Sequence, residues 1–579
     1  MFSFRFLVFF LAFMSVLEAE VAVAATTTLP GPADLNRVLP TQPAPSTPSA
    51  VPEQNIPVPS PSYSMPEPKN AKSLHFVLHG VAFEGVTVFN AAQLNDLYGP
   101  YVGKDITLDT AYQIAAALTD RYRQEGYFLS RAFIPAQDIA DGNLKIQAVE
   151  GYIGEVSLTG DAPASSVIND ALTTIRVYCG ALYGRPVRLQ VLERHLLLLN
   201  DVPGYSFQAA LEPMRNDINE PAVKLILTAR KTKSVTTVSI DNGGSRYIGP
   251  YETSASWSGS LLPMQQTDLS IQYTPTIKYM SGDLYALNAT QKIMLSPAAS
   301  LDITGGYSNA VPGYTLKQDD ITSQSSNGGI GFNYNIVRQR DANLSTRLSV
   351  DFRDSASNIL DTVLSRDRVR AMNIGLSYDD TDAWFGNNYP GHNTLALTFR
   401  HGLPIFNSNS TNDPEASRPD TSPNFVKLMA NYNRLQNLPN NFQGSLAVSG
   451  QKASQSLYSS EEFGYGGMAI GRAYDTSEIS GDSGISGSLE TRYLGLSAIH
   501  QVIFMPYAFY DIGKVWSYST GQPEQISGAS AGLGMRVQYA YGLSGDFYAA
   551  KPLTKPVSTP LYGDNGRAPR YVFQITDKF

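Results

Sequence analysis

The strongest constraint on this chain is an alternation of apolar and polar residues from Lys233 to Phe579, a region without a convincing helical pattern. In Leu344 to Arg353, Leu, Thr, Leu, Val and Phe share one face, whereas Ser, Arg, Ser, Asp and Arg share the other. A soluble β-sandwich also alternates. These segments, however, are about ten residues long, the length of a tilted strand that crosses a bilayer. Because Asn-, Asp-, Gly- and Ser-rich connections separate them, the pattern predicts a transmembrane β-barrel.

The same template places sixteen antiparallel strands in this region, and an even number is typical of a bacterial barrel. Two of the segments, near residues 424 and 529, alternate poorly. The expected strands start near residues 235, 251, 267, 284, 299, 329, 344, 370, 393, 424, 441, 486, 505, 529, 543 and 570.

Composition excludes several other classes of protein. Charged residues make up 16% of the chain, below the roughly 25% of soluble domains. Beyond the N-terminus no stretch approaches the roughly 18 apolar residues of a membrane helix. The net charge of -8 argues against a nucleic-acid partner. The single cysteine, Cys179, excludes an intramolecular disulfide and a CxxC-type zinc site, and we expect it to pack as a small apolar residue.

Residues 1–25 have the pattern of a secretory signal peptide. Arg5 supplies the positive charge, Phe6 to Leu17 is a continuous apolar run, and Ala22-Val23-Ala24 offers a small-residue cleavage site. Twelve apolar residues are too few to span a bilayer comfortably. We therefore expect the mature protein to leave the cytoplasm.

Residues 26–72 form a proline-rich linker that is interrupted by one short island. Within the island, Leu35, Val38 and Leu39 fall at positions i, i+3 and i+4, so it could form two helical turns. So short a helix is marginal alone in water. We expect it to dock against another part of the protein.

Two copies of a small α/β module follow, each with the order β-α-α-β-β. In the first copy the expected elements are Leu74–Val81, Ala91–Tyr98, Leu108–Gly126, Tyr127–Ile134 and Leu144–Val149. In the second they are Glu155–Thr159, Val167–Ile175, Arg188–Leu199, Phe207–Glu212 and Ala222–Thr228.

The C-terminal strand resembles the recognition strand of bacterial outer-membrane barrels. Tyr571, Phe573, Ile575 and the terminal Phe579 lie on one face, and Asp577 interrupts that face. This resemblance implies that the barrel-assembly machinery inserts the chain into the outer-membrane lipid.

Three motifs, taken in order and with their spacing, extend the resemblance to nearly the whole mature chain. They are Gly126-Tyr127 through Val149-Glu150-Gly151, Leu192-Glu193-Arg194 through Val202-Pro203-Gly204, and Asp241-Asn242-Gly243-Gly244-Ser245 with Gly249. They resemble the outer-membrane transporters of two-partner secretion, the hemolysin-activator and filamentous-hemagglutinin-transporter family. The resemblance implies a plug helix and linker (26–72), two polypeptide-transport-associated (POTRA) modules (73–150 and 151–231) and a sixteen-strand barrel (232–579).

The family also implies a contact between a loop and the barrel wall. The glycine-rich segment Gly464 to Gly484 contains Gly471-Arg472-Ala473-Tyr474-Asp475, and a later strand contains Phe509-Tyr510-Asp511-Ile512-Gly513. In the family a loop that folds into the lumen presents the arginine to this aspartate. Ala473 stands where the family has glycine, and alanine disfavours positive φ. An Arg–carboxylate fork could hold the loop in one conformation. The pair would contribute about 0–1 kcal/mol if the lumen is hydrated, whereas loss of one partner would cost roughly 3–5 kcal/mol if the pair is desolvated.

The sequence contains no complete motif of a serine protease, a metal site or a phosphate-binding site. Gly481-Asp482-Ser483-Gly484 spells the surroundings of a trypsin-like serine, but nothing links a histidine base to Ser483. The six histidines lack HExxH spacing, and no phosphate-binding GxxxxGK motif occurs. We expect no catalytic residues, no metal and no cofactor.

We therefore expect a translocation pore in a Gram-negative outer membrane, with the POTRA modules in the periplasm. Its partner would be a secreted exoprotein with an N-terminal secretion domain, added as a strand at Leu129–Phe133 or at Phe207–Leu211. Folding of the partner outside the cell would supply the energy. The alternatives are a factor for outer-membrane protein assembly, which usually has more POTRA modules, and a ligand-gated solute porin.

Overall fold

The computed structural model describes residues 29–38, 68, 70–139, 141–162, 165–180, 184–215, 217, 219–275, 282–496, 501–559 and 565–579. The predicted signal peptide, Leu39 and most of the proline-rich linker lie outside the described residues, and the side chain of Val38 is not described. Of the three predicted plug residues, only the side chain of Leu35 can therefore be placed.

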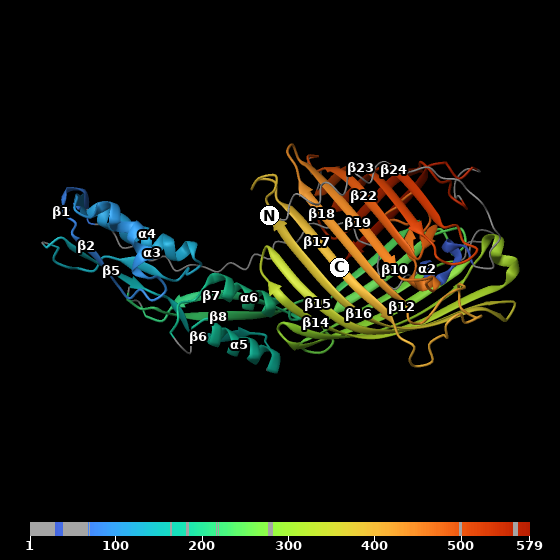
Figure 1. Cartoon of the computed structure of the whole chain (residues 1–579), viewed down its shortest axis with the longest axis horizontal. Coiled ribbons are helices and arrows are strands. Elements are labelled where there is room, and N and C mark those ends of the chain that lie inside the picture. The colour runs from blue at the N-terminus through green and yellow to red at the C-terminus, as the bar shows by residue number, and fades with distance from the viewer. Residues whose placement is uncertain are drawn as a thin grey trace.

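Sixteen antiparallel strands close into a barrel (Figure 1). The last strand pairs with the first. The predicted fold class is confirmed. The strands are β9 (Val235–Asp241), β10 (Glu252–Gly259), β11 (Gln265–Thr274), β12 (Asp283–Ser296), β13 (Ala299–Val311), β14 (Ile321–Arg338), β15 (Ala342–Ile359), β16 (Thr362–Asp382), β17 (Gly391–Gly402), β18 (Val426–Asn437), β19 (Phe442–Ala453), β22 (Ser483–Tyr493), β23 (Val502–Trp516), β24 (Gln525–Tyr539), β25 (Ser544–Pro552) and β26 (Arg570–Lys578).

The largest errors in the predicted starts concern β14 and β16, which begin at Ile321 and Thr362 rather than near 329 and 370. In the first part of β14, which the prediction missed, Thr322, Gln324 and Ser326 lie on one face of the strand, so this face has no apolar stripe. A template for strands inside the hydrocarbon misses such residues, because only lipid contact requires an apolar face. The poorly alternating segments near 424 and 529 do form strands, β18 and β24.

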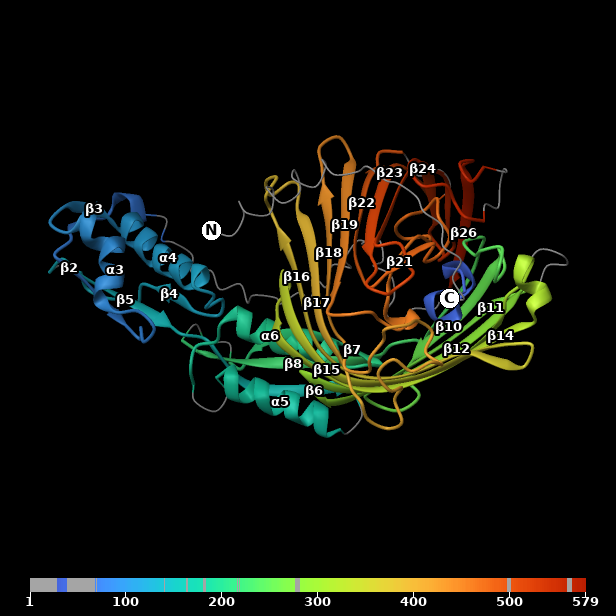
Figure 2. The ribbon, with the colours of Figure 1, turned by 45° about the vertical axis from the view of Figure 1, so that its right-hand side comes forward.

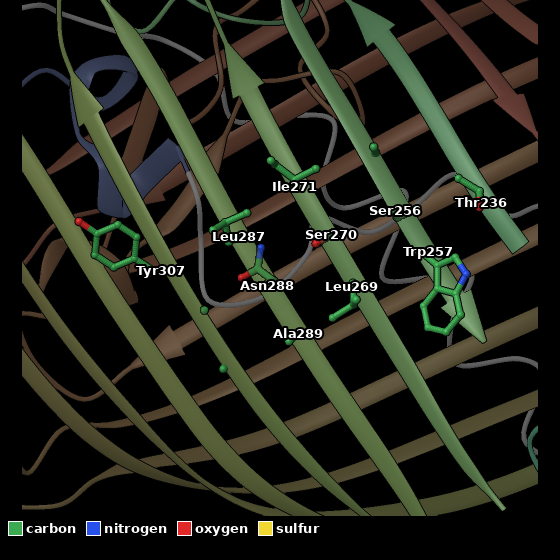
Figure 3. A pocket seen from close by; sticks show the side chains of 13 residues that line it. Thr236, Ser256, Trp257, Leu269, Ser270, Ile271, Leu287, Asn288, Ala289 and Tyr307 are labelled. Atoms are coloured by element: carbon green, nitrogen blue, oxygen red, sulfur yellow. The ribbon is translucent and has the colours of Figure 1, made fainter. Parts of the chain in front are cut away.

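The barrel wall has an apolar outer face and a polar inner face. In β15, Leu348 and Phe352 are exposed outward, whereas Ser349 and Arg353 are buried on the lumenal side. Figure 3 shows part of the outer face, where β9 to β13 form a shallow apolar hollow of about 630 Å³. Among the described residues, no helix has the length and apolar character of a membrane span.

The C-terminal strand presents its predicted stripe on the outer face. Tyr571, Ile575 and Phe579 are exposed, Phe573 is half-buried, and Val572 is buried on the opposite face. Asp577, which interrupts the stripe, pairs with Val238 of β9 across the closure of the barrel.

The first α/β module precedes the second on the chain, and both lie at one end of the barrel (Figures 1 and 2). The first consists of β1 (His75–Val77), β2 (Gly80–Glu84), α3 (Ala91–Tyr98), β3 (Asp105–Thr107), α4 (Leu108–Gln124), β4 (Arg131–Phe133) and β5 (Asn143–Val149). The second consists of β6 (Tyr152–Gly160), α5 (Ser166–Tyr178), α6 (Leu189–Asn200), β7 (Tyr205–Pro213) and β8 (Ala222–Lys231). Their three-stranded sheets have the orders β2-β5-β4 and β6-β8-β7.

Two predicted elements of the first module are wrong in extent. The expected strand Leu74–Val81 divides into β1 and β2, because β1 pairs with the unpredicted strand β3, whereas β2 pairs with β5. The expected strand Tyr127–Ile134 shrinks to β4, because residues 127–130 form turns. The proposed boundaries 73–150, 151–231 and 232–579 stay predictions.

Each module has an apolar core of its own. In α4 the side chains of Ile114, Ala115, Leu118 and Tyr122 are buried, and the Tyr122 hydroxyl donates to Glu150 at 2.8 Å. In the second module Cys179 is fully buried in the core, and burial raises the pKa of its thiol to about 12.

The second module is held against the barrel by ion pairs and apolar contacts. Asp201, at the C-terminal end of α6, accepts two 2.8 Å hydrogen bonds from the Arg338 guanidinium at the end of β14. Glu193 lies 2.7 Å from Arg340 in the following turn. Met264 and Met294 of the barrel join the apolar core of the module. The module is therefore fixed at the barrel mouth.

Candidate functional site: the lumenal loop and its clamp

The connection between β19 and β22, residues 454–482, folds back into the barrel. It carries two short strands, β20 (Phe463–Tyr465) and β21 (Ile479–Gly481), which pair with each other and contact β22, β23 and β24 of the wall (Figure 2). The ring of Tyr465 lies so close to Gly513 that a Cβ at that position would overlap it. A glycine at 513 therefore lets this lumenal loop lie flat against the wall.

The structure brings Arg472 and Asp511 together in a two-bond fork. The Arg472 Nε donates to Asp511 Oδ2 at 3.0 Å, and its Nη2 donates to Oδ1 at 2.9 Å. The backbone N–H groups of Gly471 and Arg472 donate to the same Oδ2 at 3.1 and 3.0 Å. Asp511 is fully buried, so the ion pair is desolvated. Removal of one partner from such a pair costs roughly 3–5 kcal/mol of stability.

A second carboxylate completes the surroundings of Arg472. Its Nη1 lies 2.7 Å from Glu490 Oε2, and its Nη2 donates to Ser488 Oγ at 2.8 Å. The guanidinium also stacks on the Phe509 ring at 3.5 Å from the centroid, a favourable cation–π position. We did not predict Glu490, although Ser488, Glu490 and Arg492 alternate toward the lumen on β22.

The glycine-rich backbone explains how the loop turns at this point. Gly466, Gly467 and Gly471 have φ of 122°, 111° and 81°, a region that favours glycine. Ala473 is not among the described residues with positive φ. The departure from the family pattern at this position therefore creates no backbone strain.

The remaining predicted motif residues also lie at contacts of the loop. The Tyr474 hydroxyl donates to the carbonyls of Ala529 and Lys555 at 3.1 and 2.9 Å. Asp475 lies 2.9 Å from Arg570 of β26. The functional roles of these residues stay predictions.

The plug segment lies against the loop inside the lumen. It comprises a short 3-10 turn, η2 (Gly31–Ala33), and the helix α2 (Leu35–Val38). Leu35 is buried with Ile248, Leu284 and Ala310 of the barrel. Arg37 lies 2.5 Å from Glu462, and its carbonyl accepts a hydrogen bond from Ser477 Oγ at 3.0 Å.

The base of the loop is fixed by further buried ion pairs. Glu461 lies 2.8 Å from Arg400 and 2.9 Å from Lys427 of the wall. Arg418, in the connection between β17 and β18, is buried 2.5 Å from Asp482 and 3.2 Å from Glu462. These pairs join the plug, the loop and the wall into one network.

This network accounts for the apparent protease motif. Asp482 is paired with Arg418, and the Ser483 hydroxyl contacts the Tyr518 hydroxyl at 2.8 Å and the Ala453 N–H at 3.0 Å. Neither partner of Ser483 is a histidine. Within the described ranges no group of three or more His, Cys, Asp or Glu side chains could hold a metal ion.

Two family models match the chain. Residues 76–151 match the ShlB-type POTRA domain, and residues 222–535 match the haemolysin secretion/activation protein ShlB/FhaC/HecB. The second match covers more than half of the chain. The chain belongs to this family. It is therefore an outer-membrane β-barrel transporter of the two-partner secretion type, with its POTRA modules in the periplasm.

Relatives of this transporter agree with that assignment. The heme/hemopexin transporter protein HuxB of Haemophilus influenzae (strain 86-028NP) is 24% identical over 78% of this chain and 79% of its own length. The outer membrane transporter CdiB of Escherichia coli is 23% identical over 83% and 79%. The solved structure of CdiB from Escherichia coli superposes with a TM-score of 0.66 at 19% identity, covering 91% of this chain and 94% of the other. The structural likeness supports the fold.

Proposed function

We propose that this transporter exports one secreted exoprotein, which carries an N-terminal secretion domain, and that the POTRA modules recognise this partner in the periplasm. The observation that carries the proposal is the position of the second module. The Asp201–Arg338 fork holds it at the barrel mouth, so a polypeptide bound to its sheet would lie beside the pore entrance.

The edge of β7 is the better of the two candidate docking strands. In the described chain β7 pairs only with β8, and β4 pairs only with β5. β7 has nine residues, whereas β4 has three. Because an added strand gains affinity from main-chain hydrogen bonds, we propose that the partner docks along Phe207–Leu211 rather than Leu129–Phe133.

Export also requires a path through the lumen of the barrel that a polypeptide can pass. The plug segment and the lumenal loop both occupy the lumen, and non-covalent contacts that include buried ion pairs hold each of them in place. We propose that the plug leaves first and that the clamp keeps the loop on the wall during passage. Burial of apolar surface as the partner folds outside the cell would make passage favourable.

Disulfide crosslinking tests the docking proposal. Gln208 and Ala210 are exposed on β7, so Gln208→Cys and Ala210→Cys should each crosslink to cysteines placed in the secretion domain of the partner. Ala116→Cys on the exposed side of α4 is the matched control, and the buried Cys179 should stay unreactive. Crosslinks from Ala116→Cys alone, or from none of the three variants, would contradict docking on β7.

A role in the assembly of other outer-membrane barrels is the alternative. It predicts that deletion of the gene lowers the amounts of many barrel proteins in the outer membrane. Export predicts unchanged amounts of those proteins and the loss of one secreted protein, so quantitative proteomics of the two fractions separates the two functions.

A further inference from the structure

The seam where the barrel closes is only partly held by backbone pairing. β26 and β9 pair through five residues, from Gln574↔Asp241 to Lys578↔Thr237. β9 ends at Asp241, whereas β26 begins at Arg570. Residues 570–573 of β26 therefore extend beyond the ladder, on the side of the barrel away from the POTRA modules.

The side chain of Asn242 continues the ladder across part of this gap. Its Nδ2 donates to the Tyr571 carbonyl at 2.9 Å, and its Oδ1 accepts from the Phe573 N–H at 2.8 Å. The Asn242 N–H also donates to the Phe573 carbonyl at 3.2 Å. A primary amide offers the same donor and acceptor as a peptide group.

Arg570 spans the rest of the gap and faces in two directions. Its Nη2 donates to the carbonyls of Gly243 and Gly244 at 2.8 and 2.9 Å. Its Nη1 donates to the Tyr474 carbonyl at 2.8 Å and lies 2.9 Å from Asp475 Oδ1. One nitrogen thus holds the turn that follows β9, while the other holds the lumenal loop.

The turn after β9, residues 242–249, also contacts the plug and the loop. Ser245 Oγ donates to the Pro32 carbonyl at 2.9 Å, and Ile248 packs with Leu35 of the plug. A Cβ on Gly243 would overlap Met468 of the loop. The seam, the loop and the plug therefore meet at this turn, and Arg570 is buried at the junction.

We propose that Arg570 is a second positioning residue for the lumenal loop, acting through Asp475, and that it couples the position of the loop to closure of the β26–β9 seam. Arg472 anchors the loop to β23, whereas Arg570 anchors it three residues further along to the seam. Movement of the loop away from the wall removes the Tyr474 and Asp475 contacts of Arg570. The β9 turn then depends on Asn242 and on the remaining half of the Arg570 fork.

The choice of arginine fits this role. A guanidinium presents its donors on a planar fork, so two nitrogens can reach partners on opposite sides. A lysine ammonium is a single point of charge and cannot hold both sides at these distances. Arg570→Lys should therefore keep the charge but lose one of the two connections.

Two measurements on the full-length transporter test the proposal. The first is the rate at which an extracellular maleimide labels Ala469→Cys, a reporter in the loop. The second is the temperature to which samples must be heated before the folded barrel unfolds and migrates differently on a gel, a reporter of the seam. Arg570→Gln and Asp475→Asn should each raise the labelling rate about tenfold, as expected for loss of charged hydrogen bonds, and the double variant should be no faster than the faster single variant.

Two controls distinguish an effect on the position of the lumenal loop from a general loss of barrel stability. Arg347→Gln breaks a more exposed ion pair with Asp302 on the wall, away from the loop, and should not change the labelling rate. A disulfide between Ser239→Cys and Thr576→Cys, which face each other across the seam, should restore the unfolding temperature of Arg570→Gln but leave the labelling fast.

The proposal is overturned if Arg570→Gln lowers the unfolding temperature without faster labelling, or if Asp475→Asn leaves labelling unchanged. Should Arg570→Gln fail to insert, Asp475→Asn and Arg570→Lys decide the matter, because each keeps some contacts of Arg570. These outcomes do not depend on which partner is exported.

Discussion

Arg37 of the plug and Glu462 of the lumenal loop, 425 residues apart in the chain, form an ion pair of 2.5 Å inside the barrel. Glu462 also lies 3.2 Å from Arg418, so it retains a cation when the plug departs. The plug can therefore leave without stranding a buried carboxylate, whose uncompensated burial is costly. This arrangement favours a plug that is removable.

The first prediction concerns the plug as a barrier. Deletion of residues 31–40 should raise the ion conductance of the transporter in planar bilayers, because it removes the segment that fills the lumen. Secretion should stay largely intact. Deletion of residues 44–53, in the linker, is the control of equal length. Equal conductance of the wild type and the 31–40 deletion would show that the segment is no plug.

The second prediction concerns the charge of the plug. Arg37→Glu places a third carboxylate beside Asp34 and Glu462, so repulsion should release the plug and raise the conductance toward that of the deletion. Arg123→Glu, on the exposed end of α4, serves as the matched control. A closed channel in Arg37→Glu would mean that apolar packing of Leu35 alone retains the plug.

The third prediction concerns the clamp between loop and wall. Arg472→Ala should impair secretion more than Asp511→Ala, because it strands the buried Asp511, whereas Arg472 keeps Glu490 when Asp511 is lost. The double variant should be no worse than the worse single variant. Barrel insertion and heat resistance should change little. Additive losses in secretion rate would show that the two residues act separately.

The fourth prediction concerns the joint between the second module and the barrel. Asp201→Ala should broaden the distribution of distances between spin labels on the module and on the barrel, and it should slow secretion. Lys224→Ala breaks the pair with Glu155 inside the module and should leave the distribution narrow. An unchanged distribution in Asp201→Ala would show that the apolar contacts suffice.

The fifth prediction concerns pH. Burial and the nearby Arg194 lower the pKa of His195 to about 4, below the ordinary value of about 6.5. The cation is therefore favoured in the unfolded state, so the stability of the second module is retained above pH 6.5 and falls as pH drops toward 4. Burial raises the pKa of Glu193 in the same helix, which acts in the opposite direction.

Hydrogen exchange of α6 in the whole protein measures this effect. His195→Phe keeps a ring beside Tyr178, on which His195 stacks, but cannot titrate. The protection of the α6 amides, which is the intrinsic exchange rate relative to the observed rate at the same pH, should fall between pH 6.5 and 4 more in the wild type than in His195→Phe. Parallel pH profiles would exclude His195 as the cause.

Local patterns in the sequence were enough to predict the strands and the repeated modules. A strand in lipid must alternate, and a helix on a core must carry an apolar stripe, as Ile114, Ala115 and Leu118 do. β3 escaped prediction because three residues hold too little pattern. The polar ends of β14 and β16 escaped because they have no apolar face.

Contacts between distant residues were harder to predict. The Arg472–Asp511 pair was expected only because the family has it. Arg570 contacts Gly243 across 327 residues, and Asp201 contacts Arg338 across 137, and nothing local marks either pair. Glu490 was within reach of prediction, because a lone acid on the lumenal face of β22 needs a cation when it is buried.

Comparison of the proteins released by wild-type and gene-deleted cells tests export most directly. We predict that one protein, which carries the N-terminal secretion domain, disappears from the medium and the cell surface after deletion. The wild-type gene should restore it, and the Arg472→Ala variant should restore it poorly. An unchanged set of released and surface proteins would contradict the proposed function.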